Sequence, residues 1–205
     1  MRGPVGRMAP LPRAGGLPAA CRRLAAWALA LTLALAGTSP AWAHKPSDSY
    51  LHLRAVPQDR VEMRWDLALR DLELLLQVDR DGNGEITWGE VRTRSDDIAA
   101  LARQALVLRS GGQACTWEAP QALQLDRHSD GTYAVLRMDA RCPPLKEALA
   151  VTYTLLFEVD PTHRGLVQWQ PPGAVAAQAR IFSVDSPQQP LTLAAPGAWD
   201  TLRQY

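Results

Sequence analysis

Residues 79–90, DRDGNGEITWGE, have the pattern of a twelve-residue calcium loop. Oxygen-bearing side chains stand at loop positions 1, 3 and 5, which are Asp79, Asp81 and Asn83. Glu90 stands at position 12, where a carboxylate can give both of its oxygens to one ion. Because calcium takes six to eight oxygen ligands, a short loop supplies them only if alternate residues point inward. The pattern therefore predicts a Ca²⁺ site.

The other loop positions agree with this prediction. Gly84 stands at position 6, where the loop must turn sharply, and the main-chain carbonyl of Glu85 at position 7 is a further predicted ligand. Thr87 at position 9 would act directly or through water. Four acids oppose one base, Arg80, so the loop carries a charge of −3, which favours a bound cation. The alternative is an acidic, glycine-rich surface turn that holds no ion.

Apolar residues recur at helical spacing on both sides of the loop. The leucines before it predict a helix over residues 68–78, and residues 88–105 predict helical structure with a break or restart at Ser95 or Asp96. The expected unit is a helix–calcium loop–helix insertion at about residues 68–105. Such units generally pair, so here the rest of the domain would have to support the helices.

The remainder of the sequence has the period of two that is typical of half-buried strands. Residues 49–56 and 61–67 predict a hairpin. From residue 106 onward, short extended segments alternate with turn signals. We expect strands at 106–108, 114–118, 121–127, 132–141, 148–159, 166–170, 179–184 and 191–193. The predicted class is α+β, a mainly antiparallel β-sandwich with the inserted helix–calcium loop–helix unit.

The first 43 residues have the three-part layout of a secretory signal peptide. Residues 1–23 hold five arginines and no acid, residues 24–36 are apolar except for Thr32, and a small-residue motif ends at Ala43. We expect cleavage after Ala43 and a single periplasmic or secreted domain over residues 44–205. An uncleaved membrane anchor is the alternative, although 13 apolar residues are short for a span. No other stretch is long and apolar enough for one.

Charge and cysteine usage agree with export. The mature chain has 17 basic against 21 acidic residues, a net charge of −4 without a basic patch, which argues against a nucleic-acid partner. Cys21 lies in the signal peptide and leaves Cys115 and Cys142 as an even pair. We predict a disulfide between them that closes a loop of about 28 residues. Two buried free thiols are the alternative.

The histidines offer a second chemistry. After cleavage His44 would be the N-terminal residue, and a free amine with an imidazole can hold Cu(II) or Ni(II). His52 lies on the polar face of a predicted strand, and His128 and His163 lie in turns where each could pair with a carboxylate of its own turn. No motif for a catalytic nucleophile appears, so the sequence does not favour an enzyme. A hydrolase would require a clustered Asp–His pair in a pocket.

Several segments of the mature chain resemble a known family. They are residues 44–51, 65–72, 79–92, 126–135 and 160–165. Together they resemble the extracytoplasmic N-terminal domain of bacterial membrane proteins of the hydrogenase/urease accessory (HupE/UreJ-like) type. The resemblance implies a domain that precedes membrane helices in a family associated with nickel supply. This sequence ends at Tyr205 without such helices, so a truncated reading frame and a stand-alone periplasmic form are both expected alternatives, and permease activity is not carried over.

These observations predict an exported calcium-binding domain. Its single loop would bind Ca²⁺ in a mainly structural role, and the domain would act as a binding or interaction module. One alternative is capture of nickel or another transition metal for a membrane permease, through His44 with His52, His128 or His163. The other alternative is an extracytoplasmic hydrolase.

Overall fold

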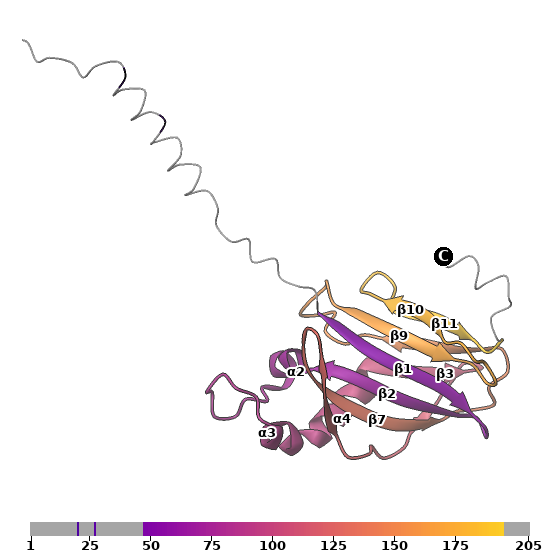
Figure 1. The fold of residues 1–205 in the computed structure, drawn as a ribbon. Coiled ribbons are helices and arrows are strands. Elements are labelled where there is room, and N and C mark those ends of the chain that lie inside the picture. Colours follow the sequence, from indigo (N-terminus) through magenta and orange to yellow (C-terminus); the bar gives the residue numbers. More distant parts are fainter. Residues whose placement is uncertain (1–19, 21–26, 28–46, 195–205) are drawn as a thin grey trace, which may run out of the picture. The chain divides into compact units, whose positions relative to one another are not determined.

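The computed structural model of the chain describes Ala20, Trp27 and residues 47–194 (Figure 1). Apart from Ala20 and Trp27, the predicted signal peptide of residues 1–43 lies outside the described residues. The cleavage site after Ala43, and His44 itself, also lie outside them.

The larger of two β-sheets has seven strands. Its strands are β1 (Asp48–Val56), β2 (Arg60–Ala68), β5 (Thr116–Trp117), β6 (Gln124–His128), β7 (Gly131–Arg141), β9 (Arg164–Gln170) and β10 (Gln178–Phe182). They follow the order β10-β9-β1-β2-β7-β5, and β6 also pairs with β7. Only the pair β1–β9 is parallel among the pairings of this sheet. The hairpin predicted from residues 49–56 and 61–67 is therefore confirmed.

The smaller sheet has four antiparallel strands in the order β11-β8-β3-β4. They are β3 (Leu106–Ser110), β4 (Gln113–Ala114), β8 (Ala148–Tyr153) and β11 (Gln188–Thr192). The prediction of a mixed fold, with two sheets of mostly antiparallel strands, is confirmed.

Three helices lie between β2 and β3 in the chain. They are α2 (Leu69–Leu76), α3 (Trp88–Thr93) and α4 (Ser95–Ala105). Each helix buries an apolar face, because Leu72, Val91 and Ile98 are at most 1% exposed. The expected break in the second helical segment falls at Arg94, one residue before the predicted position. Among the residues that the structure describes, no helix is long and apolar enough to cross a membrane.

One hydrophobic core joins the two sheets and the helices. Alternate side chains of β1 and β2 point into it, and Trp65 and Trp169 are fully buried there. The helices contribute Leu72, Val91 and Ile98 to the same core, so burial against the sheets stabilises this short helical segment.

The largest differences between predicted and observed strands are at residues 148–159 and 114–118. The strand predicted over residues 148–159 ends at Tyr153, because residues 155–159 form a turn that buries Leu155, Leu156 and Phe157. The apolar run was interpreted as extended structure, although a buried turn needs the same residue types. The strand predicted over residues 114–118 is two short strands, β4 and β5, which belong to different sheets.

The predicted disulfide between Cys115 and Cys142 is present. Cys115 lies between β4 of the smaller sheet and β5 of the larger sheet, and Cys142 directly follows β7. The bond therefore fixes the point where the chain crosses from one sheet to the other.

Replacement of both cysteines by serine should lower the free energy of unfolding by roughly 3 kcal/mol, because the bond closes a long loop in the unfolded chain. Urea denaturation of the wild type and the double variant measures this difference. Dithiothreitol should destabilise the wild type and leave the double variant unchanged. Equal stability of the oxidised wild type and the variant would contradict the prediction.

Candidate functional site

The predicted calcium loop connects α2 to α3 and is held by buried residues at both ends. Val78 precedes the loop and Val91 follows it, and both are 0% exposed. Within the loop, Ile86 is partly buried against the core. The polar residues between these anchors face solvent, as a loop that exchanges ions with solvent requires.

Three of the predicted ligands converge. Carboxylate oxygens of Asp79, Asp81 and Glu90 all lie within 4.8 Å of one another. Two oxygens that bind one calcium ion at 2.3–2.6 Å can be no more than about 5 Å apart. The spacing and the all-oxygen donor set therefore fit a hard divalent cation.

Main-chain N–H groups fix the first ligand position. Both carboxylate oxygens of Asp79 accept hydrogen bonds, from the Gly82 N–H and the Gly84 N–H at 2.8 Å each. Gly82 and Gly84 have φ values of +70° and +82°, which side-chain-bearing residues rarely adopt. The glycine predicted to allow the sharp turn therefore also carries one of the N–H groups that orient Asp79.

Asn83 and Glu85 occupy the middle of the loop. The Asn83 amide donates to Asp81 Oδ2 at 3.0 Å, and Asn83 Oδ1 accepts from the Glu85 N–H at 2.7 Å. These hydrogen bonds stabilise the consecutive turns by which alternate residues point to the inner side of the loop.

Glu90 has two tasks. Its carboxylate accepts the Arg80 N–H at 2.8 Å and the Thr87 N–H at 2.9 Å, and Thr87 Oγ1 accepts the Glu90 N–H in return. The second exchange is a capping box that begins α3. The hydrogen bond from the Thr87 N–H, with those from its hydroxyl and from Arg80, lowers the pKa of Glu90. The carboxylate stays ionised at neutral pH, as a calcium ligand must.

Arg94 joins the two sides of the loop and was not identified from the sequence. Its guanidinium donates to the Leu76 carbonyl at the end of α2 and to Asp97 in α4, each at 2.7 Å. A cation at a helix C-terminus is stabilised by the helix dipole. Only the folded chain shows this role, because 18 residues separate Arg94 from Leu76.

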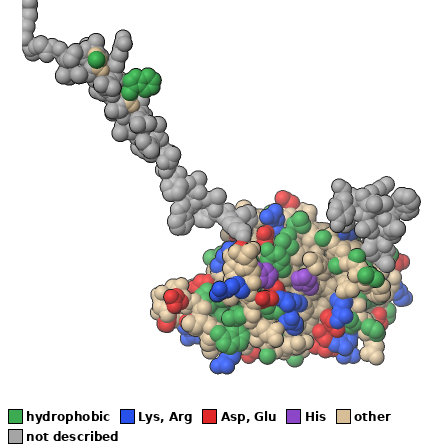
Figure 2. All heavy atoms as spheres, viewed as in Figure 1, with side chains coloured by type: hydrophobic (Ala, Val, Ile, Leu, Met, Phe, Trp, Pro, Cys, Tyr) green, Lys and Arg blue, Asp and Glu red, His purple; other side chains and the backbone are tan. Residues whose placement is uncertain are grey.

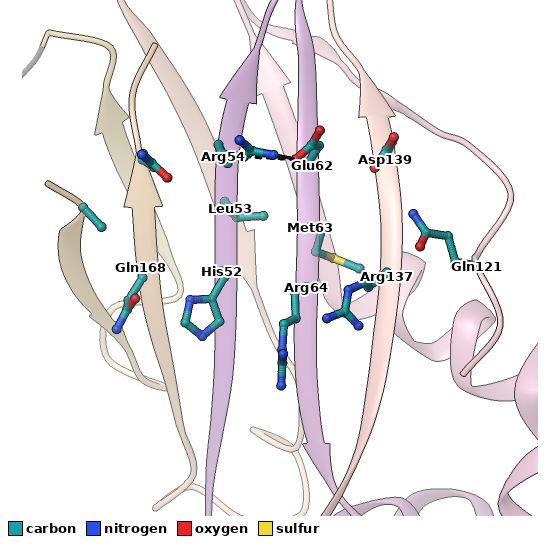
Figure 3. A pocket seen from close by; sticks show the side chains of 12 residues that line it. His52, Leu53, Arg54, Glu62, Met63, Arg64, Gln121, Arg137, Asp139 and Gln168 are labelled. Carbon is teal, nitrogen blue, oxygen red and sulfur yellow. Dashed lines mark hydrogen bonds and ion pairs between the residues drawn. The ribbon is translucent and has the colours of Figure 1, made fainter. Parts of the chain in front are cut away.

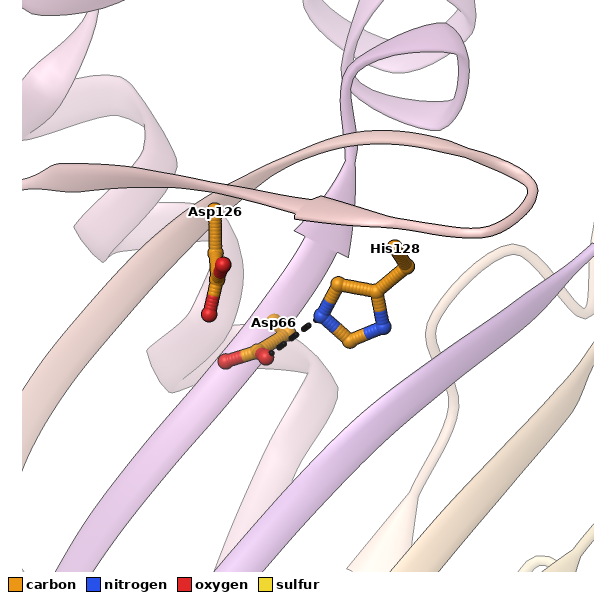
Figure 4. Close-up of side chains that lie close together, drawn as sticks. All are labelled: Asp66, Asp126 and His128. Carbon is orange, nitrogen blue, oxygen red and sulfur yellow. Dashed lines mark hydrogen bonds and ion pairs between the residues drawn. The ribbon is translucent and has the colours of Figure 1, made fainter.

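A second polar cluster lies at one end of β2 and β6 (Figure 4). Ligand atoms of Asp66, Asp126 and His128 lie within 4.8 Å of one another, and His128 Nε2 lies 3.0 Å from Asp66 Oδ2. Arg64 donates to Asp66 at 2.7 and 2.8 Å and to Asp126 at 2.6 Å. The hydrogen bond from Arg64 to Asp126 lowers the pKa of Asp126. Arg64 therefore supplies the cation that two neighbouring carboxylates need.

His128 lies close to Asp126 of its own turn, as predicted, and its hydrogen bond is to Asp66 on β2. The ring also packs against both Tyr50 and Tyr133, with ring centroids 5.0 and 4.3 Å away. This arrangement could not be predicted from the sequence, since Asp66 and His128 are 62 residues apart. The cluster therefore contains an Asp–His pair, the element that a hydrolase would require.

His163 lies in a third, fully buried cluster and is 0% exposed. Its Nδ1 lies 3.0 Å from Ser47 Oγ, and Ser47 donates to the carboxylate of Asp71. Its Nε2 lies 2.6 Å from the hydroxyl of Tyr153. Asp, Ser and His are the residue types of a serine hydrolase, but here the serine stands between the other two and faces no solvent.

The buried hydrogen bonds continue from Tyr153 to Trp65. The Ser49 hydroxyl lies 2.7 Å from the Tyr153 hydroxyl and accepts the Trp65 indole N–H at 3.0 Å. The Trp65 indole N–H can only donate, and the single proton of the Ser47 hydroxyl points to Asp71. These two ends determine which group donates in each hydrogen bond between them. Protons point in one direction through Trp65, Ser49, Tyr153, His163, Ser47 and Asp71.

Burial shifts the pKa values of Asp71 and His163 in opposite directions. Desolvation raises the pKa of Asp71 and lowers the pKa of His163 to about 4. The neutral imidazole carries its proton on Nδ1, which is the tautomer that the chain requires.

The histidines do not form a joint metal site in the part of the chain that the structure describes. Its two groups of three or more potential metal ligands are the calcium loop carboxylates and the cluster of Asp66, Asp126 and His128. Neither contains more than one histidine. Comparisons with protein-family models and with curated proteins find no match to this chain.

The stability of the protein should fall as the pH falls from about 6.5 to about 4. In this range His163 is protonated in the unfolded chain but stays neutral in the folded chain. The free energy of unfolding therefore decreases by a total on the order of 3 kcal/mol between these two pH values. Urea denaturation at several pH values measures this loss. Asp71 contributes the opposite slope, because its pKa is raised in the folded state.

The variant His163→Gln separates the two contributions. Glutamine has a donor and an acceptor but does not titrate, so the variant should be less stable at pH 7 and should lack the part of the pH dependence that His163 causes. An unchanged pH dependence in the variant would show that another group is responsible.

Proposed function

We propose that this protein is an extracytoplasmic calcium-binding domain in which Ca²⁺ has a mainly structural role. The observation that carries the proposal is the convergence of Asp79, Asp81 and Glu90 within 4.8 Å in a loop whose turns are already formed. Asp79, Asp81, Asn83 and Glu90 would hold the ion through side chains, and Glu85 through its main-chain carbonyl. The ion would neutralise most of the loop charge of −3.

The structural role follows from how the loop is supported. Val78 and Val91 are buried at its two ends, and Arg94 joins the end of α2 to α4. A calcium sensor needs helices that separate when the ion binds. Here the helices pack on the core of the two sheets, which we propose to be a β-sandwich that takes the place of a second calcium-binding unit. Calcium would then stiffen the loop without moving the helices.

The disulfide supports the extracytoplasmic assignment, because such bonds persist in oxidising compartments. Calcium concentrations there are steady, and calcium sites of extracellular modules have dissociation constants of about 0.1–1 mM. The resemblance to the HupE/UreJ-like domains is consistent with a membrane protein as the partner of this domain. We therefore propose a membrane protein as the partner, and a signal peptide as the means of export.

Calorimetric titration should give one calcium site per chain, with a dissociation constant of about 0.1–1 mM. The variant Glu90→Gln should bind at least about tenfold more weakly, because it loses a charged ligand. Glu85→Gln is the matched control: it removes the same charge from the same loop but keeps the main-chain carbonyl, and it should bind nearly as well as the wild type. If both variants bind like the wild type, the loop is not the calcium site.

Calcium should also stabilise the fold. At 10 mM, a site of this affinity raises the free energy of unfolding by about 1.4–2.7 kcal/mol. Thermal unfolding with 10 mM calcium and with a chelator measures the effect, and Glu90→Gln should show little of it. The far-ultraviolet circular dichroism of the native protein should be the same in both conditions. A large gain of helix on adding calcium would indicate a switch instead of a structural ion.

A further inference from the structure

The exposed face of the larger sheet carries a polar depression of about 460 Å³, a size within the usual range of small-molecule sites (Figure 3). It lies over β9, β1, β2 and β7. Figure 2 shows histidine and basic side chains close together on this side of the molecule. The calcium loop contributes no residue to the depression.

One row of side chains crosses the depression from strand to strand. In the strand register, His52 is opposite Gln168 on one side and Arg64 on the other, and Arg64 is opposite Arg137. Figure 3 shows the imidazole of His52 and the side chains of Arg64 and Arg137 next to one another. Like charges directly opposite each other destabilise a sheet unless another group compensates them.

All but one of the charged side chains around the depression have an opposite charge close by. Arg54 pairs with Glu62, and Asp139 pairs with Arg60. Arg64 pairs with Asp66 and Asp126 in the cluster described above. In the part of the chain that the structure describes, Arg137 has no ion pair, and its guanidinium donates to the neutral Gln124 at 2.9 Å. Arg137 is thus the residual positive charge of the depression.

The charges select the kind of anion. An arginine fork binds a carboxylate or a phosphate through two parallel hydrogen bonds. Because Glu62 and Asp139 also line the depression, a dianionic phosphate would be repelled more strongly than a single carboxylate. The arrangement therefore favours a ligand with one negative charge.

The rest of the lining selects a polyhydroxylated ligand. Leu53 and Met63 also line the depression, but they are only 1% and 3% exposed because their side chains point into the core. The side chains of Gln121 and Gln168 reach the depression from its two sides (Figure 3). Each amide offers both a donor and an acceptor, which matches the hydroxyl groups of a sugar.

We propose that this face of the larger sheet binds an acidic sugar, a saccharide unit that carries one carboxylate. The carboxylate lies at Arg137, His52 lies two strands away on the other side of Arg64, and the hydroxyl groups contact Gln121 and Gln168. The proposal goes beyond calcium binding and does not depend on it.

Titration of the purified protein with glucuronate, followed by nuclear magnetic resonance of the backbone amides, tests the site. Saturable shifts are expected for residues of β1, β2 and β7. Arg137→Gln should weaken binding at least about tenfold, since a charge-assisted pair contributes about 1.5–3 kcal/mol. Arg103→Gln, which removes an exposed arginine from α4, is the matched control and should bind like the wild type. Thermal unfolding of both variants checks that they are folded.

Three ligands separate the parts of the proposal. Glucose and acetate should each bind more weakly than glucuronate. Equal binding of glucose would overturn the role of the carboxylate, and equal binding of acetate would overturn the assignment to a sugar. No binding of glucuronate, or equal binding to Arg137→Gln, would overturn the site itself. Glu90→Gln should bind glucuronate normally, so that a failure of the calcium proposal and a failure of this one can be told apart.

Discussion

The carboxylate of Asp71 is buried among the two sheets and the first helix, and one directed chain of hydrogen bonds accommodates it there. The chain begins at the Trp65 indole and ends with the Ser47 hydroxyl on the carboxylate. A buried carboxylate without partners would cost several kcal/mol, so the groups along this chain constrain one another. Removing any one of them would leave a donor or an acceptor unsatisfied in the core.

This chain fixes parts of the fold that are distant in sequence. It joins the start of β1, β2, α2, β8 and the turn before β9. Asp71 lies in the first turn of α2, the helix that leads into the predicted calcium loop. The loop is therefore mounted on a helix held by hydrogen bonds at its beginning, and by Arg94 at its end. Such a mounting suits a site in which the ion stiffens a loop, because neither end of the helix is free to move.

The exposed face of the larger sheet contrasts with this buried chain. Asp66, Arg64, Asp126 and His128 compensate one another at one end of the face, and salt bridges compensate most other charges on it. Arg137 is left over, beside a row of amide and imidazole groups. The predicted calcium loop and this face lie on different elements, so the proposed ion site and the proposed ligand surface share no residues.

The sequence determined the local features of this protein, and the tertiary structure decided the long-range ones. The loop pattern predicts that Asp79, Asp81 and Glu90 lie near one another because their positions depend on twelve consecutive residues, and the period of two located the β1–β2 hairpin for the same reason. The disulfide could be predicted because only two cysteines remain after the predicted signal peptide. The predicted end of β8 was wrong because a buried turn and a buried strand need the same apolar residues. The partners of His128 and His163 could not be predicted, since Asp66 and Ser47 lie 62 and 116 residues away and only sheet pairing brings them together.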